Sequence, residues 1–417
     1  MRGKRILILG GGRYNVPSIR AAQKAGFLTF VADRNAEAPG LRIADHAFAI
    51  DVNDLDSLVD AVKENKGVDG VVAMAEAGVR AAAQISARLG LPSISENAAE
   101  NATSKALMRR LWRQIGTYSP EFRIATTLNE AEYAAAELAP FPLMFKPDRS
   151  FGGSRGVTRI ERSEEVSAAF AAAKAGAIGN SDVVVERCVE GTEHSCEVLI
   201  WKGKSSLLCV GQKIKSTPPY RVDVSVQYPA QLTLTQLKIV ADMCQRAVTA
   251  LGLTQGLAHI EFGYSAGGPV LFELGARAGG GHTPEIAHHV SAVNEFVEAC
   301  RMACGIPPIQ IAPMGHRGAD YRFLIFPPGV VESVKMAPYL TDDPAVLDVG
   351  LTVRPGDTIR PLQSTSDRAG FVVTIADTRE EAMERADRAC RGIALQYLDG
   401  TTHHPLDLVQ FREVAAS

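Results

Sequence analysis

Residues 259–277 constrain the fold most strongly, because two runs of alternating apolar and polar residues flank a Ser-Ala-Gly-Gly segment at 265–268. This pattern predicts a β-hairpin centred near Gly267. The symmetry places Glu261 opposite Glu273 on one face, with their Cβ atoms about 5 Å apart. Two carboxylates at that separation repel each other unless they share a proton or bind a hard divalent cation such as Mg²⁺. The plain alternative is an exposed hairpin whose two acids face water.

The composition is that of an ordinary protein of several domains. The 417 residues are 46% hydrophobic and 22% charged, which suits a large core and about two to four domains. A net charge of −3 gives no basic field for nucleic acid, and no apolar run reaches the roughly 18 residues that span a membrane. The amino end runs too soon into glycines for a secretory signal, and the cysteines are too scattered for a disulfide framework. We therefore expect a cytoplasmic protein with neither a nucleic-acid nor a membrane partner.

The amino-terminal quarter alternates between strand and helix patterns. Residues 5–33 read as strand, glycine turn, helix and strand, and further αβ units predict an open parallel βαβ sheet over residues 1–97. Dinucleotide-binding domains begin in this way, with an acid at the place of Asp33, but Asn15 stands where they have a third glycine. Glu76 follows a strand at the edge where such sheets bind ligands, so it is a candidate substrate contact. A solvated loop acid is the alternative for Glu76.

Two lysines and a glycine-rich segment are suited to binding phosphate. Lys105 lies near the start of a predicted helix, where backbone N–H groups attract anions, and Lys146 ends a short buried strand. The segment 150–156 follows that strand and offers flexible backbone donors, although it is not a Walker loop. Each of these signals is weak when taken alone.

A second buried strand, over residues 182–189, is followed by further acids. The backbone where such a strand passes into a linker can hydrogen-bond an adenine edge, and Glu193 can accept ribose hydroxyls. Arg277, four residues beyond Glu273, adds a fixed cation for a phosphoryl oxygen or a carboxylate.

Taken in order, these segments resemble the ATP-grasp superfamily, from the glycine opening at Gly10 to about residue 315. The pattern is a helix lysine, a strand lysine, a glycine-rich loop, Glu-x-x-Val, Gly-x-Glu, His-x-Glu and Glu-x-x-x-Arg. The resemblance implies an α/β protein with three parts. They are a Rossmann-like pre-ATP-grasp domain at 1–97, an ATP-grasp domain at 98–315 with a small lid at about 117–195, and a carboxyl-terminal α+β domain at 316–417.

The resemblance also implies a role for each candidate residue. The ATP phosphates would be neutralised by Lys105 and Lys146 under the loop of Gly152, Gly153 and Ser154. Adenosine would be held by Glu186, Arg187, Val189 and Glu193. Magnesium would be bound by Glu261 and Glu273, with two ions expected and Mn²⁺ able to substitute. Arg277 would be the catalytic cation that stabilises the transferred phosphoryl group.

One position departs from the superfamily pattern. Members commonly have Glu-x-Asn-x-Arg, in which the asparagine is a metal ligand, whereas this chain has Gly275 there. Either water or another residue takes that coordination position, or metal binding is weaker. The segment after Arg277 resembles L-amino acid ligases and related carboxylate-amine ligases, in which it lies beside the acyl substrate. Gly280, Gly281 and His282 are therefore candidate substrate contacts, although His282 fits an ordinary loop histidine equally well.

The resemblance predicts an ADP-forming carboxylate-amine ligase. Such an enzyme uses ATP and Mg²⁺ to activate a small carboxylic acid, such as an amino acid, as an acyl phosphate and joins it to an amine. A purine-pathway carboxylating or formylating ligase of the same superfamily is the alternative enzyme, and Gly275 motivates a third interpretation, a nucleotide-binding module without turnover. The motifs do not identify the substrate, because specificity lies in pocket shape. A homodimer is expected only from the general frequency of that assembly.

Overall fold

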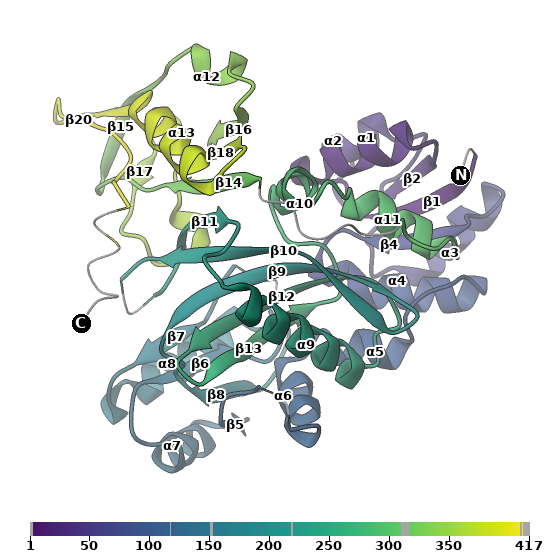
Figure 1. Cartoon of the computed structure of the whole chain (residues 1–417), viewed down its shortest axis with the longest axis horizontal. Helices are drawn as coiled ribbons and strands as arrows, with labels where there is room; N and C mark the ends of the chain where they lie inside the picture. The colour runs from purple at the N-terminus through teal and green to yellow at the C-terminus, as the bar shows by residue number, and fades with distance from the viewer. Residues whose placement is uncertain are drawn as a thin grey trace.

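The computed structural model describes residues 3–116, 118–150, 153–217, 220–309, 317–408 and 411. These residues form four β-sheets with helices packed on their faces (Figure 1). No helix among them is long and apolar enough to cross a membrane. The cysteines are all free thiols.

The amino-terminal sheet is parallel, with the strand order β3-β2-β1-β4. Ile6, Leu7 and Ile8 have no exposed surface, as expected of a parallel strand that helices cover on both faces. The predicted open parallel sheet is thus confirmed. Asp33 accepts a hydrogen bond from the Gly11 N–H at 2.8 Å, so it braces the glycine turn. The elements are β1 (Arg5–Leu9), η1 (Arg13–Asn15), α1 (Val16–Lys24), β2 (Leu28–Ala32), α2 (Pro39–Ile43), β3 (His46–Phe48), α3 (Leu55–Glu64), β4 (Gly70–Ala73), α4 (Glu76–Leu89) and α5 (Glu96–Asn101).

A large antiparallel sheet forms the centre of the molecule (Figure 1). Its strand order is β13-β12-β9-β10-β11-β14-β18-β16. Helix α9 (Leu234–Leu251) covers one face, and α11 (Glu295–Ala303) shares an apolar core with β1 of the amino-terminal sheet and with β9. The strands are β9 (Thr192–Trp201), β10 (Lys204–Lys215), β11 (Asp223–Tyr228), β12 (Gln255–Ser265), β13 (Gly268–Gly275), β14 (Gly318–Leu324), β16 (Val346–Leu351) and β18 (Gly370–Ala376). This sheet runs across the boundary predicted at residue 315, and the division into three domains stays a prediction.

A small antiparallel sheet, ordered β5-β8-β6-β7, lies within the stretch predicted as a lid. Helices α7 and α8 bring small alanines such as Ala131 and Ala169 against Phe145 and Val185, so the helices approach the sheet closely. The elements are α6 (Lys105–Gln114), β5 (Phe122–Ala125), α7 (Leu128–Glu137), β6 (Leu143–Pro147), β7 (Thr158–Ile160), η2 (Ser163–Glu165), α8 (Val166–Gly176) and β8 (Val183–Arg187).

The remaining carboxyl-terminal strands form a fourth sheet, ordered β17-β15-β19-β20. Helix α13 packs on β14 and β18 of the large sheet, and its first turn is capped by the Thr378 hydroxyl, which accepts from the Glu381 N–H. The elements are α10 (Thr283–Ser291), β15 (Gly329–Met336), α12 (Tyr339–Asp342), β17 (Thr358–Ile359), η3 (Thr365–Asp367), α13 (Arg379–Arg391), β19 (Ile393–Tyr397) and β20 (Thr402–His403).

The predicted hairpin is confirmed as β12 and β13. Ser265 pairs with Gly268 at the turn, and Glu261 pairs with Glu273. Gly268 has a φ of +105°, a backbone conformation that favours glycine. Phe262 and Leu274 are buried in the core under α9, which leaves the two carboxylates on the opposite face.

Candidate functional site

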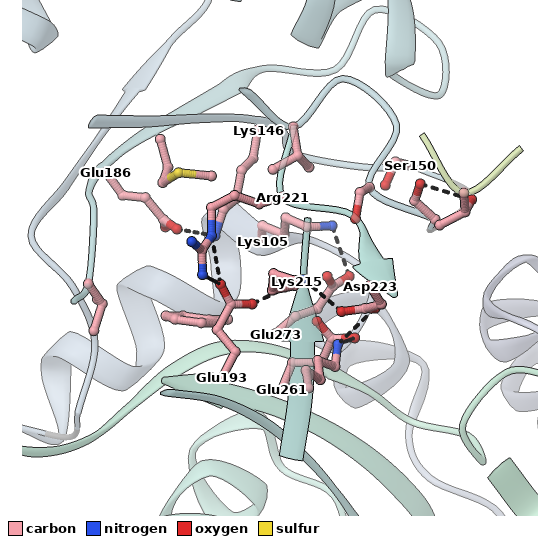
Figure 2. A pocket seen from close by; sticks show the side chains of 18 of the residues that line it. Lys105, Lys146, Ser150, Glu186, Glu193, Lys215, Arg221, Asp223, Glu261 and Glu273 are labelled. Carbon is pink, nitrogen blue, oxygen red and sulfur yellow. Dashed lines mark hydrogen bonds and ion pairs between the residues drawn. The ribbon is translucent and has the colours of Figure 1, made fainter. Parts of the chain in front are cut away.

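A cavity of about 270 Å³ lies between the large sheet and the small sheet. Side chains from α6, β6 and β8 face those from β9, β10, β12 and β13 across it (Figure 2). Most of the predicted site residues line this one cavity: Lys105, Lys146, Gly153, Ser154, Glu186, Arg187, Val189, Glu193, Glu261, Glu273, Arg277 and Gly280. Residues far apart in the chain are therefore brought together as the motif order implied.

The other predicted residues lie close by. Gly281 lines a second cavity of about 380 Å³, which adjoins the first because Lys213, His259 and Glu261 line both. Glu76 lies outside the two linings and pairs with Arg277. His282 is buried, with its Nε2 atom 3.1 Å from Asp348, and Gly152 lies outside the described residues.

Lys105 is placed by the start of α6. The Asp148 carboxylate, just beyond β6, accepts hydrogen bonds from the Ser104 hydroxyl at 2.7 Å and from the Ala106 N–H at 2.8 Å. These contacts tie the helix N-terminus to the end of the strand that carries Lys146. Both lysines therefore reach the cavity from elements that the Asp148 carboxylate holds together.

The two hairpin carboxylates are each held by a buried lysine. Glu273 lies 2.9 Å from Lys105 Nζ, and Glu261 lies 2.7 Å from Lys213 Nζ. Burial raises the pKa of each carboxyl. The positive charges nearby, of which the paired lysine is the strongest, lower it by more, so both pKa values lie below the ordinary value. Both acids are ionised at neutral pH, and they neither share a proton nor simply face open water.

The ionised pair fits Mg²⁺, which proteins usually hold with one or two carboxylates plus waters and substrate phosphates. Within the described ranges, no group of three or more His, Cys, Asp or Glu side chains is arranged to hold a metal. Magnesium here would therefore depend on the hairpin pair and on phosphate oxygens.

Glu186 lies between two cations at the back of the cavity. One of its oxygens contacts Lys146 Nζ, and the other lies 2.8 Å from Arg109 Nη2. Burial raises the pKa of Glu186, but the positive charges of Arg109 and Lys146 lower it by more than burial raises it, so the pKa lies below its ordinary value. The carboxylate is thus committed to cations, while Arg187, Cys188 and Val189 beyond it line the cavity.

Sequence reasoning missed a charged cluster from β10, β11 and the segment between them, which Figure 2 shows beside Glu193. Glu193 lies 2.6 Å from Arg221 and 3.1 Å from Lys215, while Asp223 lies 2.9 Å from Lys215 and 3.6 Å from Lys213. Lys213 and Lys215 are two residues apart in a strand, so they share a face. The spacing of these two lysines was the one feature of the sequence that could have indicated this cluster.

Gly275, at the unusual motif position, lies against the contact between Glu76 and Arg277. The Arg277 Nε atom donates to Glu76 Oε2 at 3.1 Å, and a Cβ atom built at position 275 would lie 3.1 Å from the same oxygen. Burial raises the pKa of Glu76, and Arg277 opposes that shift. Gly275 therefore leaves room for an ion pair between the amino-terminal region and the hairpin.

Three family models match successive parts of the chain. Residues 19–93 match the ATP-grasp N-terminal domain, residues 139–285 match the ATP-grasp domain, and residues 322–397 match the L-amino acid ligase C-terminal domain 2.

Individual proteins match over most of the chain. An uncharacterised protein of Sinorhizobium fredii is 28% identical over 82% of this chain and 72% of its own length. A formate-dependent phosphoribosylglycinamide formyltransferase of Synechococcus is 27% identical over 94% of this chain and 97% of its own length. Among solved structures, the L-amino acid ligase from Bacillus licheniformis superposes with a TM-score of 0.80 at 23% identity, covering 95% of this chain and 99% of that chain.

Proposed function

Because this chain is a member of the ATP-grasp superfamily, we propose that it is an ADP-forming carboxylate-amine ligase that uses ATP and Mg²⁺. It activates a small carboxylic acid as an acyl phosphate and joins the acyl group to an amine. The observation that carries the proposal is the ionised pair of Glu261 and Glu273, which face the lysines of one cavity. The family match at residues 322–397 makes amino acids the first substrates to test.

In this proposal the lysines and carboxylates of the cavity exchange partners when ATP binds. Lys105 turns from Glu273 to the phosphates, and Lys146 contacts them while it stays beside Glu186. Positive charge is added by Lys213, Lys215 and Arg221, and the loop of Gly153 and Ser154 lies against the phosphates. Glu261 and Glu273 are then free to hold magnesium, which would screen the phosphate charge. The backbone from Arg187 to Val189 contacts the adenine edge, and the carboxylate of Glu193 accepts from the ribose hydroxyls.

The second cavity holds the acid next to the transferring phosphate. The acid's carboxylate oxygen attacks the γ-phosphorus, the bond to the bridging oxygen breaks, and ADP leaves. The amine nitrogen then attacks the acyl carbon, phosphate departs with the electron pair of the C–O bond, and the amine loses a proton. Arg277 contributes a fixed positive charge near the transferring group. The loop at 153–156 limits the access of water to the acyl phosphate.

One observation favours a second enzyme. The Synechococcus relative, named a formate-dependent phosphoribosylglycinamide formyltransferase, matches nearly the full length of this chain. Formate as the acid and a ribonucleotide amine as the acceptor are therefore the alternative substrates. A binding module without turnover stays the third interpretation, and cytoplasmic location and homodimerisation stay predictions.

The test is ADP release in the presence of ATP and Mg²⁺ with a panel of amino acids, and with formate plus a ribonucleotide amine as a separate arm. Product mass distinguishes the two enzymes. The expected result is ADP formation that requires both an acid and an amine and yields a product one water lighter than their sum. ATP binding without ADP release from either panel would support the binding module instead.

A further inference from the structure

Arg109 is fully buried behind the cavity and does not line it. Its Nε atom donates to Glu186 Oε2 at 2.9 Å, and its Nη2 atom donates to the Phe272 carbonyl at 2.7 Å. The guanidinium carbon lies 5.6 Å from the centre of the Trp112 ring. One side chain on α6 thus joins β8 of the small sheet to β13 of the large sheet.

Both partners of Arg109 lie next to a group proposed to act on ATP. Glu186 contacts Lys146 with its second oxygen, a pair that Figure 2 shows facing each other. Phe272 directly precedes Glu273, and its ring centre lies 5.2 Å from Lys146 Nζ. Arg109 is therefore linked to Lys146 through Glu186, and to Glu273 through the backbone of Phe272.

We propose that Arg109 is a positioning residue for phosphate binding: it fixes Glu186, and through Glu186 it aims Lys146 at the ATP phosphates. Its second bond, to the Phe272 carbonyl at 2.7 Å, anchors the guanidinium so that it holds Glu186 in one position. The inference rests on the proposed function in one respect, namely that the cavity binds ATP.

Arginine suits this role because its donors form a rigid planar fork that can bridge two acceptors. A lysine keeps the charge but cannot hold a carboxylate and a carbonyl in fixed directions. The Nη1 atom of Arg109 is buried without a hydrogen-bond partner among the described residues, which is costly for a residue that served only to fill the core.

The test compares the binding of adenosine, ADP and ATP by calorimetry without magnesium, for wild type, Arg109→Met and Arg109→Lys. If Arg109 acts through Lys146, ADP and ATP bind about tenfold or more weakly to Arg109→Met, while adenosine binding changes less than about twofold. Arg109→Lys shows an intermediate loss. In a Lys146→Met background, Arg109→Lys causes no further loss of phosphate binding, because the residue it aims is gone.

Arg322→Met is the matched control. Arg322 is also a buried arginine, held by Asp320 at 2.6 Å and Asp387 at 2.8 Å, and it lines neither cavity. This variant is expected to melt at a lower temperature and to keep the wild-type ratio of ATP to adenosine affinity.

Three results would overturn the inference. They are an equal loss for all three ligands, an unchanged ratio in Arg109→Met, and an additive effect of Arg109→Lys in the Lys146→Met background. If Arg109→Met does not fold, the comparison of Arg109→Lys with the double variant decides alone. A wild-type chain that binds ATP no better than adenosine would instead refute ATP recognition by this cavity, and the inference would fall with it.

Discussion

Replacing Glu273 by glutamine removes one charge from the hairpin pair without changing the shape of the side chain. It takes away a proposed metal ligand, and it also leaves Lys105, whose side chain is only 7% exposed, without its partner at 2.9 Å. We therefore expect Glu273→Gln to abolish ADP formation while the fold persists.

The cost to stability follows from the same contact. Two unit charges 2.9 Å apart attract by about 6 kcal/mol at an effective dielectric constant of about 20. Breaking a fully buried pair costs about 3 to 5 kcal/mol, but the Glu273 side chain is 36% exposed, so water offsets part of the loss. An unfolding free energy lower by about 1 to 3 kcal/mol is expected, which for a chain of this length lowers the melting temperature by about 1 to 3 °C.

The variant should also bind ATP differently with and without magnesium. Without the metal, Lys105 no longer has to leave a carboxylate, and a partly exposed pair worth about 1 kcal/mol corresponds to about fivefold tighter binding. With magnesium, binding should be weaker than in wild type. Calorimetry with and without the ion measures both changes, and Asp56→Asn, in an exposed pair with Arg88, is the control. Wild-type ADP formation by Glu273→Gln would refute the assignment of the hairpin.

Further predictions concern four other residues. Arg277→Lys should mainly lower kcat with little change in ATP affinity. The assay is steady-state kinetics with ATP and the acid varied separately. A change in the KM of the acid would show that Arg277 instead binds the carboxylate of that substrate. Gly275→Asn, although it restores the common motif, should lower kcat because the new side chain displaces Glu76 from Arg277; unchanged or improved turnover would contradict this. Gly153→Ala should weaken ATP binding, because Gly153 has a φ of +73° and an added Cβ would lie 2.7 Å from the Thr365 hydroxyl; equal protease cleavage of the 153–156 loop with and without ATP would indicate an ordinary surface loop. For His259, burial lowers the pKa, but the Glu197 carboxylate at 2.5 Å raises it to about 9 overall. Since the folded pKa lies above the unfolded value of about 6.5, this histidine's stabilisation of up to about 3 kcal/mol is complete below that pH and is lost as the pH rises through about 9. Urea unfolding across this range without magnesium should show the slope in wild type and not in His259→Gln.

The parts of the fold that were predictable are those encoded over short distances. The hairpin register followed from a turn and two alternating runs around Gly267, and the parallel sheet followed from apolar runs such as residues 5–9. The pairing of β11 with β14 was not predictable, because no local pattern specifies which distant strand edge a strand joins.

The candidate site divides in a similar way. Lys146 and Glu261 stand at motif positions. By contrast, Lys213 reads as part of an ordinary alternating strand, and only the order β12-β9-β10 brings its Nζ atom within 2.7 Å of Glu261. The hydrogen bond from Arg109 to Glu186 was not predictable either, because it joins residues 77 positions apart. The Glu76 contact with Arg277 spans 201 positions.

The continuity of the large sheet has a consequence for synthesis of the chain on the ribosome. Strand β11 ends at Tyr228, but its partner β14 begins only at Gly318, about 90 residues later. At about 5 to 20 residues per second, the free edge of β11 waits roughly 5 to 20 s for its partner. The helix α9 and the hairpin are made during that interval, so the open edge of β11 comes to border a half-sheet that lacks only its later strands. A nascent chain stalled before residue 318 is therefore the species most exposed to edge-to-edge aggregation and to capture by chaperones.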